Sequence, residues 1–279
     1  MTLREAYRRG REALERAEVL EAALDAWYLL EYAAGCTRSR FLACPEEMLE
    51  ESREEMFWEA VQKRAQRIPL QHITGEQEFM GLSFLVSDQV LIPRQDTEIL
   101  VEEVLKFLKP GMRFLDLCTG SGCILLSLLH ACPGAEGVGA DISAGALGVA
   151  RKNKERLSLQ ADLVQSDLFL KLRGKFDVIV SNPPYIRRGE IPALMEEVRG
   201  HEPWLALDGH EDGLFFYRRI AGECRPYLKE GGRLYLEIGC DQGTEVPGIL
   251  REQGFAGIQV VKDLAGLDRV VIGTLTGGC

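Results

Sequence analysis

Residues 114–123 read Phe-Leu-Asp-Leu-Cys-Thr-Gly-Ser-Gly-Cys, and they restrict the possible folds more than any other part of this chain. A short apolar run leads into two closely spaced glycines, and a mainly apolar stretch follows at once: Ile124, Leu125, Leu126, Leu128 and Leu129. This order predicts a strand, a tight glycine turn and a helix. In an open α/β sheet such a turn lies at the carboxyl end of a strand, where ligand crevices form.

Further short β-prone segments alternate with helical stretches along the rest of the chain. The expected strands cover residues 113–117, 137–141, 161–167, 176–182, 233–239, 257–262 and 269–274. The alternation predicts an α/β domain over residues 93–279, built on a seven-stranded, mostly parallel sheet with helices on both faces. Residues 76–92 contain β-prone pieces broken by Gly81 and Asp88, which predicts a β-hairpin or linker.

Residues 1–75 predict a small helical domain. Thr2 and Glu5 have the spacing of a capping box, and Gly35 interrupts the helical pattern. Pro45 is expected to open a second helix, and a third amphipathic stretch extends to Ile68. One apolar stripe is expected from residues at helical spacing: Leu20, Ala23, Leu24, Trp27 and Leu30.

Composition narrows the function classes. The 279 residues include 33 Lys and Arg against 43 Asp and Glu, which gives a net charge of −10. This charge argues against sequence-independent binding of a nucleic-acid phosphate backbone.

The 8 cysteines, of which Cys279 is the last, form no C-x-x-C pair and are expected to be reduced thiols. The 4 histidines have no metal-site spacing, so no metal is expected. The polar N-terminus and the absence of an apolar run of roughly 18 residues predict a soluble cytoplasmic protein without a membrane span.

The glycine turn does not have the spacing of a dinucleotide site. That fingerprint requires glycines at the positions of Cys118, Gly120 and Cys123, and only the middle one is present. The turn instead resembles the first motif of class I methyltransferases, which holds a nucleoside with an amino-acid tail. The cofactor-binding residues expected from this resemblance are Cys118, Thr119, Gly120, Ser121, Gly122, Asp141, Asp167, Leu168 and Asn182.

Two acidic residues have specific roles under this interpretation. Asp141 ends the second expected strand, and its carboxylate would accept hydrogen bonds from both ribose hydroxyls. Asp167 and Leu168 follow the third strand and would flank the adenine. Taken singly, each feature also fits a simpler role, because glycine turns are common and acidic residues often cap helices. Their order at the ends of successive strands favours the cofactor site.

The segment Asn182-Pro183-Pro184-Tyr185 follows a Val-Ile-Val strand that is expected to be buried, and we interpret it as the reaction-centre motif. Two prolines fix the backbone and remove two N–H donors, so the loop is stiff and its acceptors stay free. The Asn182 side-chain oxygen and the Pro183 carbonyl can each accept one N–H of a planar amide, on which Tyr185 can stack. Methyl transfer to such a nitrogen then depends on positioning and dipoles, and no general base is required. An isolated Asn-Pro-Pro would be interpreted as a simple turn, but its position after this strand and downstream of the glycine turn favours the functional interpretation.

Several other segments carry a resemblance that runs nearly end to end. They are Pro69–Glu76, Val90–Glu98, Glu202–Gly209 with Glu211–Gly213, and Leu236–Gly239. With the glycine turn and Asn-Pro-Pro-Tyr, they resemble the HemK family of protein-(glutamine-N5) methyltransferases. The resemblance implies a class I (Rossmann-like) methyltransferase domain, S-adenosylmethionine as methyl donor, and the glutamine of the Gly-Gly-Gln loop in class I peptide chain release factors as substrate. No direct nucleic-acid binding is expected, because the net charge is negative and the chain has no separate target-recognition domain.

The sequence departs from the family pattern at a few positions. Cys118 stands where glycine is usual, Leu168 where an aromatic is common, and Gln95-Asp96 replaces Pro-Glu. Arg94 could anchor the methionine carboxylate or pin the two domains together. Two rival functions stay open at this point: a nucleic-acid adenine N6-methyltransferase, whose target amine has the same planar geometry, and a non-catalytic adaptor.

Overall fold

A computed structural model describes residues 1–276 and divides the chain into two compact units. The first consists of Met1–Glu76 together with Met195–His201. The second consists of Gln77–Leu194 together with the chain from Glu202 onward. The short return of the chain to the first unit at residues 195–201 has no signal in the sequence pattern.

The first unit is helical. Its helices are α1 (Leu3–Arg16), α2 (Ala22–Ala34), α3 (Arg38–Ala43), α4 (Glu51–Ala65), α5 (Leu70–Thr74) and α9 (Glu196–His201). The capping box at the start of α1 is confirmed, because the Glu5 N–H donates to Thr2 Oγ1 at 3.2 Å and the Thr2 N–H donates to the Glu5 carboxylate at 3.0 Å. Gly35 ends α2 in the left-handed region at φ 61°.

Two helical expectations for this unit are wrong. Pro45 does not open a helix, because Thr37 caps α3 earlier through a hydrogen bond to the Arg40 N–H, and α4 begins only at Glu51. The expected apolar stripe is wrong at three of its five positions, since Leu20, Ala23 and Leu24 are exposed and Leu20 lies before α2. Trp27 and Leu30 are buried as expected, and the buried face of α2 also includes Ala26, Leu29 and Ala33.

The second unit is built on a seven-stranded sheet, as the sequence predicts. The strand order is β5-β4-β3-β6-β7-β9-β8, and only β9 runs antiparallel to its neighbours. The strands are β3 (Arg113–Leu117), β4 (Glu136–Asp141), β5 (Asp162–Gln165), β6 (Phe176–Ser181), β7 (Leu228–Glu237), β8 (Phe255–Lys262) and β9 (Asp268–Leu275). A separate two-stranded sheet pairs β1 (Glu76–Phe79) with β2 (Leu82–Leu85). The predicted α/β fold class with a seven-stranded, mostly parallel sheet is confirmed.

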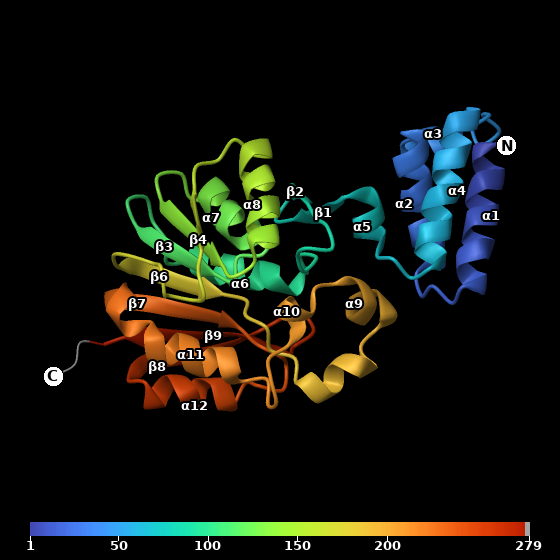
Figure 1. The fold of residues 1–279 in the computed structure, drawn as a ribbon. Helices are drawn as coiled ribbons and strands as arrows, with labels where there is room; N and C mark the ends of the chain where they lie inside the picture. The colour runs from blue at the N-terminus through green and yellow to red at the C-terminus, as the bar shows by residue number, and fades with distance from the viewer. Residues whose placement is uncertain (277–279) are drawn as a thin grey trace. The chain divides into compact units, whose positions relative to one another are not determined.

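Helices cover both faces of the large sheet (Figure 1). Alternate strand residues face opposite sides, so Val178 and Val180 pack in one core layer and Ile179 in the other. The first layer includes α6 (Asp96–Leu105) and α7 (Cys123–Ala131), and α8 (Ala144–Arg156) packs against β4 and β5. The second includes α11 (Phe215–Glu223) and α12 (Glu245–Glu252). The short helices of this unit are η1 (Arg188–Ala193), α10 (Trp204–Leu207) and η2 (Arg225–Tyr227).

The parallel strands β3, β4, β5 and β6 end at the same edge of the sheet, and their following loops therefore meet there. The cysteines at positions up to 240 are free thiols, whereas Cys279 lies outside the described residues. No helix within residues 1–276 is long and apolar enough to cross a membrane. The same residues hold no cluster of three or more His, Cys, Asp or Glu side chains arranged to bind a metal ion.

Candidate active site

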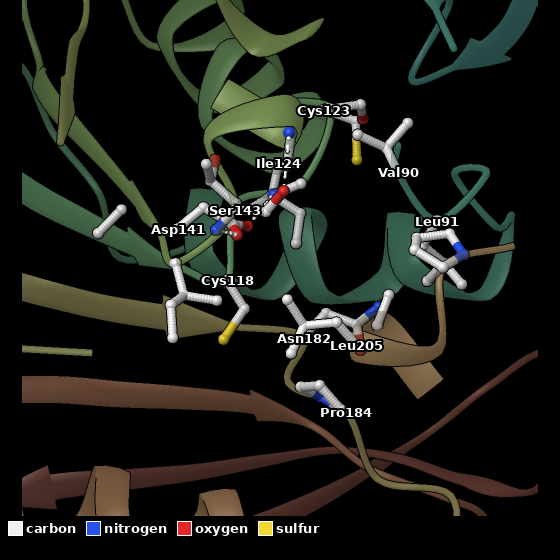
Figure 2. Close-up of a pocket in the computed structure, with 18 of the residues that line it drawn as sticks. Val90, Leu91, Cys118, Cys123, Ile124, Asp141, Ser143, Asn182, Pro184 and Leu205 are labelled. Carbon is white, nitrogen blue, oxygen red and sulfur yellow. Dashed lines mark hydrogen bonds between the residues drawn. The ribbon is translucent and has the colours of Figure 1, made fainter. Parts of the chain in front are cut away.

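A cavity of about 1070 Å³, measured with its open mouth, lies at the carboxyl edge of these strands. All of its lining residues belong to the second unit. The predicted residues that line it are Cys118, Thr119, Gly120, Ser121, Asp141, Asp167, Leu168, Asn182 and Pro184. Figure 2 shows Asp141 and Asn182 in different parts of this pocket. Gly122, Pro183 and Tyr185 do not line it.

The glycine turn leaves room for a ligand. Gly120 has φ 55°, and a Cβ added to it would meet no atom within 4 Å, so the backbone here faces open space. Gly122 instead starts α7 at φ 80°, and a Cβ added to it would lie 3.3 Å from the side chain of Ala150 in α8. Cys118 also lies in the left-handed region at φ 57°, which explains why glycine is favoured at this position.

Asp116 supports the glycine turn through two side-chain hydrogen bonds. Its buried carboxylate accepts hydrogen bonds from the Thr119 hydroxyl at 2.6 Å and from the Leu125 N–H at 3.2 Å. Burial raises the pKa of Asp116 to about 7, although both hydrogen bonds oppose the increase. Asp116 is therefore a structural support for the loop and does not line the cavity.

Asp141 joins the turn to the end of β4. Its two carboxylate oxygens accept from the Gly120 N–H and the Ser143 N–H, both at 2.9 Å. Burial raises the pKa of Asp141, and these backbone hydrogen bonds oppose the increase. Each oxygen retains a further lone pair, and Asp141 lines the cavity, so its geometry suits a ligand that carries two neighbouring hydroxyls.

An apolar part of the cavity lies after β5. Leu168 is only 5% exposed and lines the pocket with Ile142 and Phe216, which gives a flat heterocycle apolar surfaces to contact. Asp167 beside it lies 2.8 Å from Arg219 Nη1, an ion pair that holds its carboxylate at the rim. With the open glycine turn and Asp141, these residues fit a nucleoside.

Asn182 follows β6 and reaches the cavity from a firmly held loop. Its amide nitrogen donates to Thr97 Oγ1 at 3.3 Å. The Tyr185 carbonyl accepts from Gln242 Nε2 at 3.2 Å, and burial raises the pKa of the Tyr185 phenol above its usual range. Close backbone packing holds the same loop, since a Cβ on Gly213 would lie 2.4 Å from the Tyr185 carbonyl oxygen.

The support behind Asn182 was not expected from the sequence. Glu237 ends β7 and is only 2% exposed, and burial raises the pKa of its carboxyl group to about 7, although the nearby Thr97 side chain and the positive charge of Arg269 oppose the increase. A carboxylate at a strand end gives no sign in the sequence of which loop it will meet. Arg94, for which two roles were considered, lines the cavity and forms an ion pair with Glu202, and both residues belong to the second unit.

Comparisons with known proteins agree with this geometry. Residues 5–75 match the family model "PrmC N-terminal domain", and residues 94–198 match "Methyltransferase small domain". The chain is 46% identical over 275 residues to a release factor glutamine methyltransferase of Moorella thermoacetica, covering 96% of this chain and 97% of that one. It is 41% identical to the protein of the same name in Agrobacterium fabrum, covering 94% and 93%. Among solved structures, a Pyrococcus furiosus methyltransferase has a TM-score of 0.54 at 18% identity, covering 71% of this chain and 90% of that one.

Proposed function

The chain belongs to the release factor glutamine methyltransferase family, and we propose that it methylates the side-chain amide nitrogen (N5) of the glutamine in the Gly-Gly-Gln loop of class I peptide chain release factors. The observation that carries the proposal is the placement of Asn182 and Asp141 in one cavity. One residue offers an acceptor for a planar amide, and the other an acceptor pair for a ribose. The proposed substrate implies a cytoplasmic location, and no direct nucleic-acid binding is proposed.

The methyl donor is S-adenosylmethionine, which supplies an electrophilic methyl group on a sulfonium. We propose that Asp141 holds its ribose, that Asp167 and Leu168 flank its adenine, and that the backbone from Cys118 to Gly122 forms the surface beneath it. The open space over Gly120 supports this assignment, because a side chain there would occupy the cavity.

Asn182 is the residue that we propose to orient the substrate. Its side-chain oxygen would accept one N–H of the glutamine amide, which turns the nitrogen toward the methyl group. Holding the reacting atoms in line accounts for most of the rate, because an amide nitrogen is a weak nucleophile whose lone pair is delocalised. The nitrogen loses one proton to water during or after transfer.

The Pro183 carbonyl and the Tyr185 ring have less direct support. Both residues belong to the stiff loop, yet neither lines the cavity. A second acceptor at Pro183 and stacking by Tyr185 therefore stay predictions about the substrate-bound state. Pro184 lines the cavity beside Asn182 and contributes an apolar surface.

The proposal is tested by methyl transfer from labelled S-adenosylmethionine to a purified release factor. The substrates are the intact factor, the same factor with its Gly-Gly-Gln glutamine replaced by alanine, and duplex DNA. Label on the intact factor alone is the expected result. Label on DNA would support the adenine methyltransferase instead, and the comparisons give that alternative no support. Cofactor binding without any transfer would favour the adaptor.

A further inference from the structure

Residues 203–206, which lie within the family-like segment Glu202–Gly209, form one side of the cavity. Pro203, Leu205 and Ala206 line the pocket, and Figure 2 draws Leu205 among its side chains. Leu205 is also 51% exposed. A side chain that lines a cavity and is half exposed lies at the cavity mouth, so Leu205 marks the open side through which a substrate enters.

This segment is tied to the Asn-Pro-Pro-Tyr loop. Ile186 follows that loop directly and forms a parallel bridge with Asp208. The Ile186 N–H donates to the Leu207 carbonyl at 3.1 Å, and the Gly209 N–H donates to the Ile186 carbonyl at 2.8 Å. The short helix α10 therefore keeps a fixed place beside the loop that carries the reaction.

Trp204, the neighbour of Leu205 in α10, is held in place without being covered. It is 51% exposed, and its indole N–H donates to Asp208 Oδ2 at 3.2 Å. Asp208 is fixed in turn, since its carboxylate accepts from Arg188 Nη2 at 2.8 Å and from the His210 N–H at 2.9 Å. The indole is thus oriented before any partner arrives, and it loses little rotamer freedom when a partner covers it.

Trp204 and Leu205 together form an exposed apolar lip at the cavity mouth. Tryptophan is enriched at the centres of protein interfaces and is among the residues whose truncation costs the most binding energy. Because the polar edge of the Trp204 ring is occupied by Asp208, its apolar face is left to contact a partner. Leu205 continues this surface to the cavity, so a chain bound on the lip extends directly into the site.

We propose that the apolar lip binds the main chain on either side of the substrate glutamine, and that it sets the affinity for the release factor and not the rate of methyl transfer. This inference rests on the proposed function, because it concerns the same substrate. A glutamine side chain is short, so the chain that carries it must lie at the cavity mouth when its amide reaches Asn182. The two glycines that precede this glutamine have no side chains, so their backbone can lie flat against an indole and a leucine.

The test measures kcat and KM for an intact release factor with Trp204→Ala and Leu205→Ala. We expect KM to rise roughly tenfold or more for Trp204→Ala and about threefold or more for Leu205→Ala, as for contacts near the centre of an interface. At saturation, kcat should stay within about twofold of the wild type, because the lip binds the ground state and the transition state equally. The affinity for S-adenosylmethionine, measured by calorimetry, should be unchanged.

Matched variants separate contact with the substrate from effects on folding. Trp204→Phe keeps an apolar ring and Leu205→Met keeps the volume, so each should recover most of the lost affinity. Leu264→Ala removes an exposed leucine from the turn between β8 and β9, which does not line the cavity, and should behave like the wild type. Thermal unfolding should be the same for all of these enzymes.

A wild-type KM for both alanine variants would overturn the inference. A parallel loss of affinity for S-adenosylmethionine would also overturn it, because the lip would then cover the cofactor. The same holds if sedimentation shows a wild-type dimer that the alanine variants convert to monomers, since a second copy would then occupy the lip. If the wild type does not methylate the release factor at all, the proposed function fails instead.

Discussion

Asn182 and Asp141 line the same cavity. We propose that Asn182 offers one acceptor to the substrate amide and that Asp141 binds the cofactor, so their substitution should give different kinetic defects. Asp141 is tied to the glycine turn through Gly120 and faces the proposed ribose.

For Asn182→Ala we expect most turnover to be lost while cofactor affinity stays within a few-fold of the wild type. An unpaired amide N–H in the transition state costs roughly 1–3 kcal/mol, and loss of orientation adds to this. Steady-state kinetics with a release factor substrate, together with cofactor calorimetry, measures both quantities. Unchanged turnover would remove Asn182 from the reaction.

For Asp141→Ala we expect the opposite pattern, with weaker binding of S-adenosylmethionine as the main defect. Asp141→Asn is the matched variant, because it keeps the size and one acceptor while losing the second acceptor and the charge. Calorimetry should show the larger loss for alanine. A wild-type dissociation constant for both variants would refute the ribose role.

The site could be predicted only in part at the scale of single residues. Asp141, Asp167 and Asn182 were found because they end predicted parallel strands, and such ends share one edge of a sheet. Thr97 was missed because its hydrogen bond with Asn182 depends on how α6 packs beside the end of β6, which no local pattern records. Gly122 and Tyr185 were assigned to the site, yet their close neighbours are other parts of the fold.

At the scale of the elements, the loop that holds residues 182–185 is packed closely against the loop that holds residues 209–213. Gly209 and Gly213 approach the Tyr185 backbone so closely that a Cβ on either would lie under 3 Å from it. This explains the Asp-Gly pairs in that segment: at Gly213 both the close approach and the φ of 74° require glycine.

We predict that Gly213→Ala lowers the free energy of unfolding by at least about 1–2 kcal/mol, the cost of a left-handed residue alone. It should also lower kcat, because the Tyr185 carbonyl must move. Gly148→Ala is the control: Gly148 lies within α8 with no atom near the added Cβ, and alanine there should stabilise by roughly 0.5–1 kcal/mol. Urea unfolding monitored by circular dichroism gives both values. Equal effects of the two substitutions would contradict this account of the packing.

The strand pattern was the most predictable level of the structure. All seven expected strands of the large sheet are present, because alternating β-prone and helical segments leave few other arrangements. The helical unit was predicted less well. Pro45 was misread because a proline suits the first turn of a helix and also a turn between helices, and local sequence does not distinguish them.

At the scale of the whole molecule, the chain leaves the second unit after Leu194 and returns to it at Glu202. Residues 195–201 belong to the helical unit, where Glu197 forms ion pairs with Arg64 at 2.9 Å and with Arg67 at 2.8 Å. Arg64 also pairs with Asp25 at 2.7 Å. If Glu197 is removed, Arg64 therefore keeps Asp25 as a partner, whereas Arg67 loses the carboxylate that it pairs with.

We predict that Glu197→Ala destabilises the helical unit by roughly 1.5–3 kcal/mol at neutral pH, because Arg64 and Arg67 lose charge-assisted hydrogen bonds. Burial alone would raise the pKa of Glu197, but hydrogen bonds from Arg67 and Arg64 outweigh it and lower the pKa from 4.5 to about 2. The stabilisation is therefore present above pH 4.5 and lost as pH falls through about 2. Denaturant unfolding should show that the difference in the free energy of unfolding between wild type and variant is smaller at pH 3 than at pH 7. Glu196→Ala, which removes the exposed neighbouring carboxylate, is the control and should have little effect on the free energy of unfolding at either pH.

The most direct test of the central claim locates the transferred methyl group within the release factor. Peptides from the methylated factor are sequenced by tandem mass spectrometry, with the Asn182→Ala enzyme as the matched control. A single methyl group on the side-chain nitrogen of the Gly-Gly-Gln glutamine, strongly reduced with the variant, is the predicted result. A methyl group on another residue or on a carboxylate oxygen, or equal modification by both enzymes, would contradict the proposed function of this site.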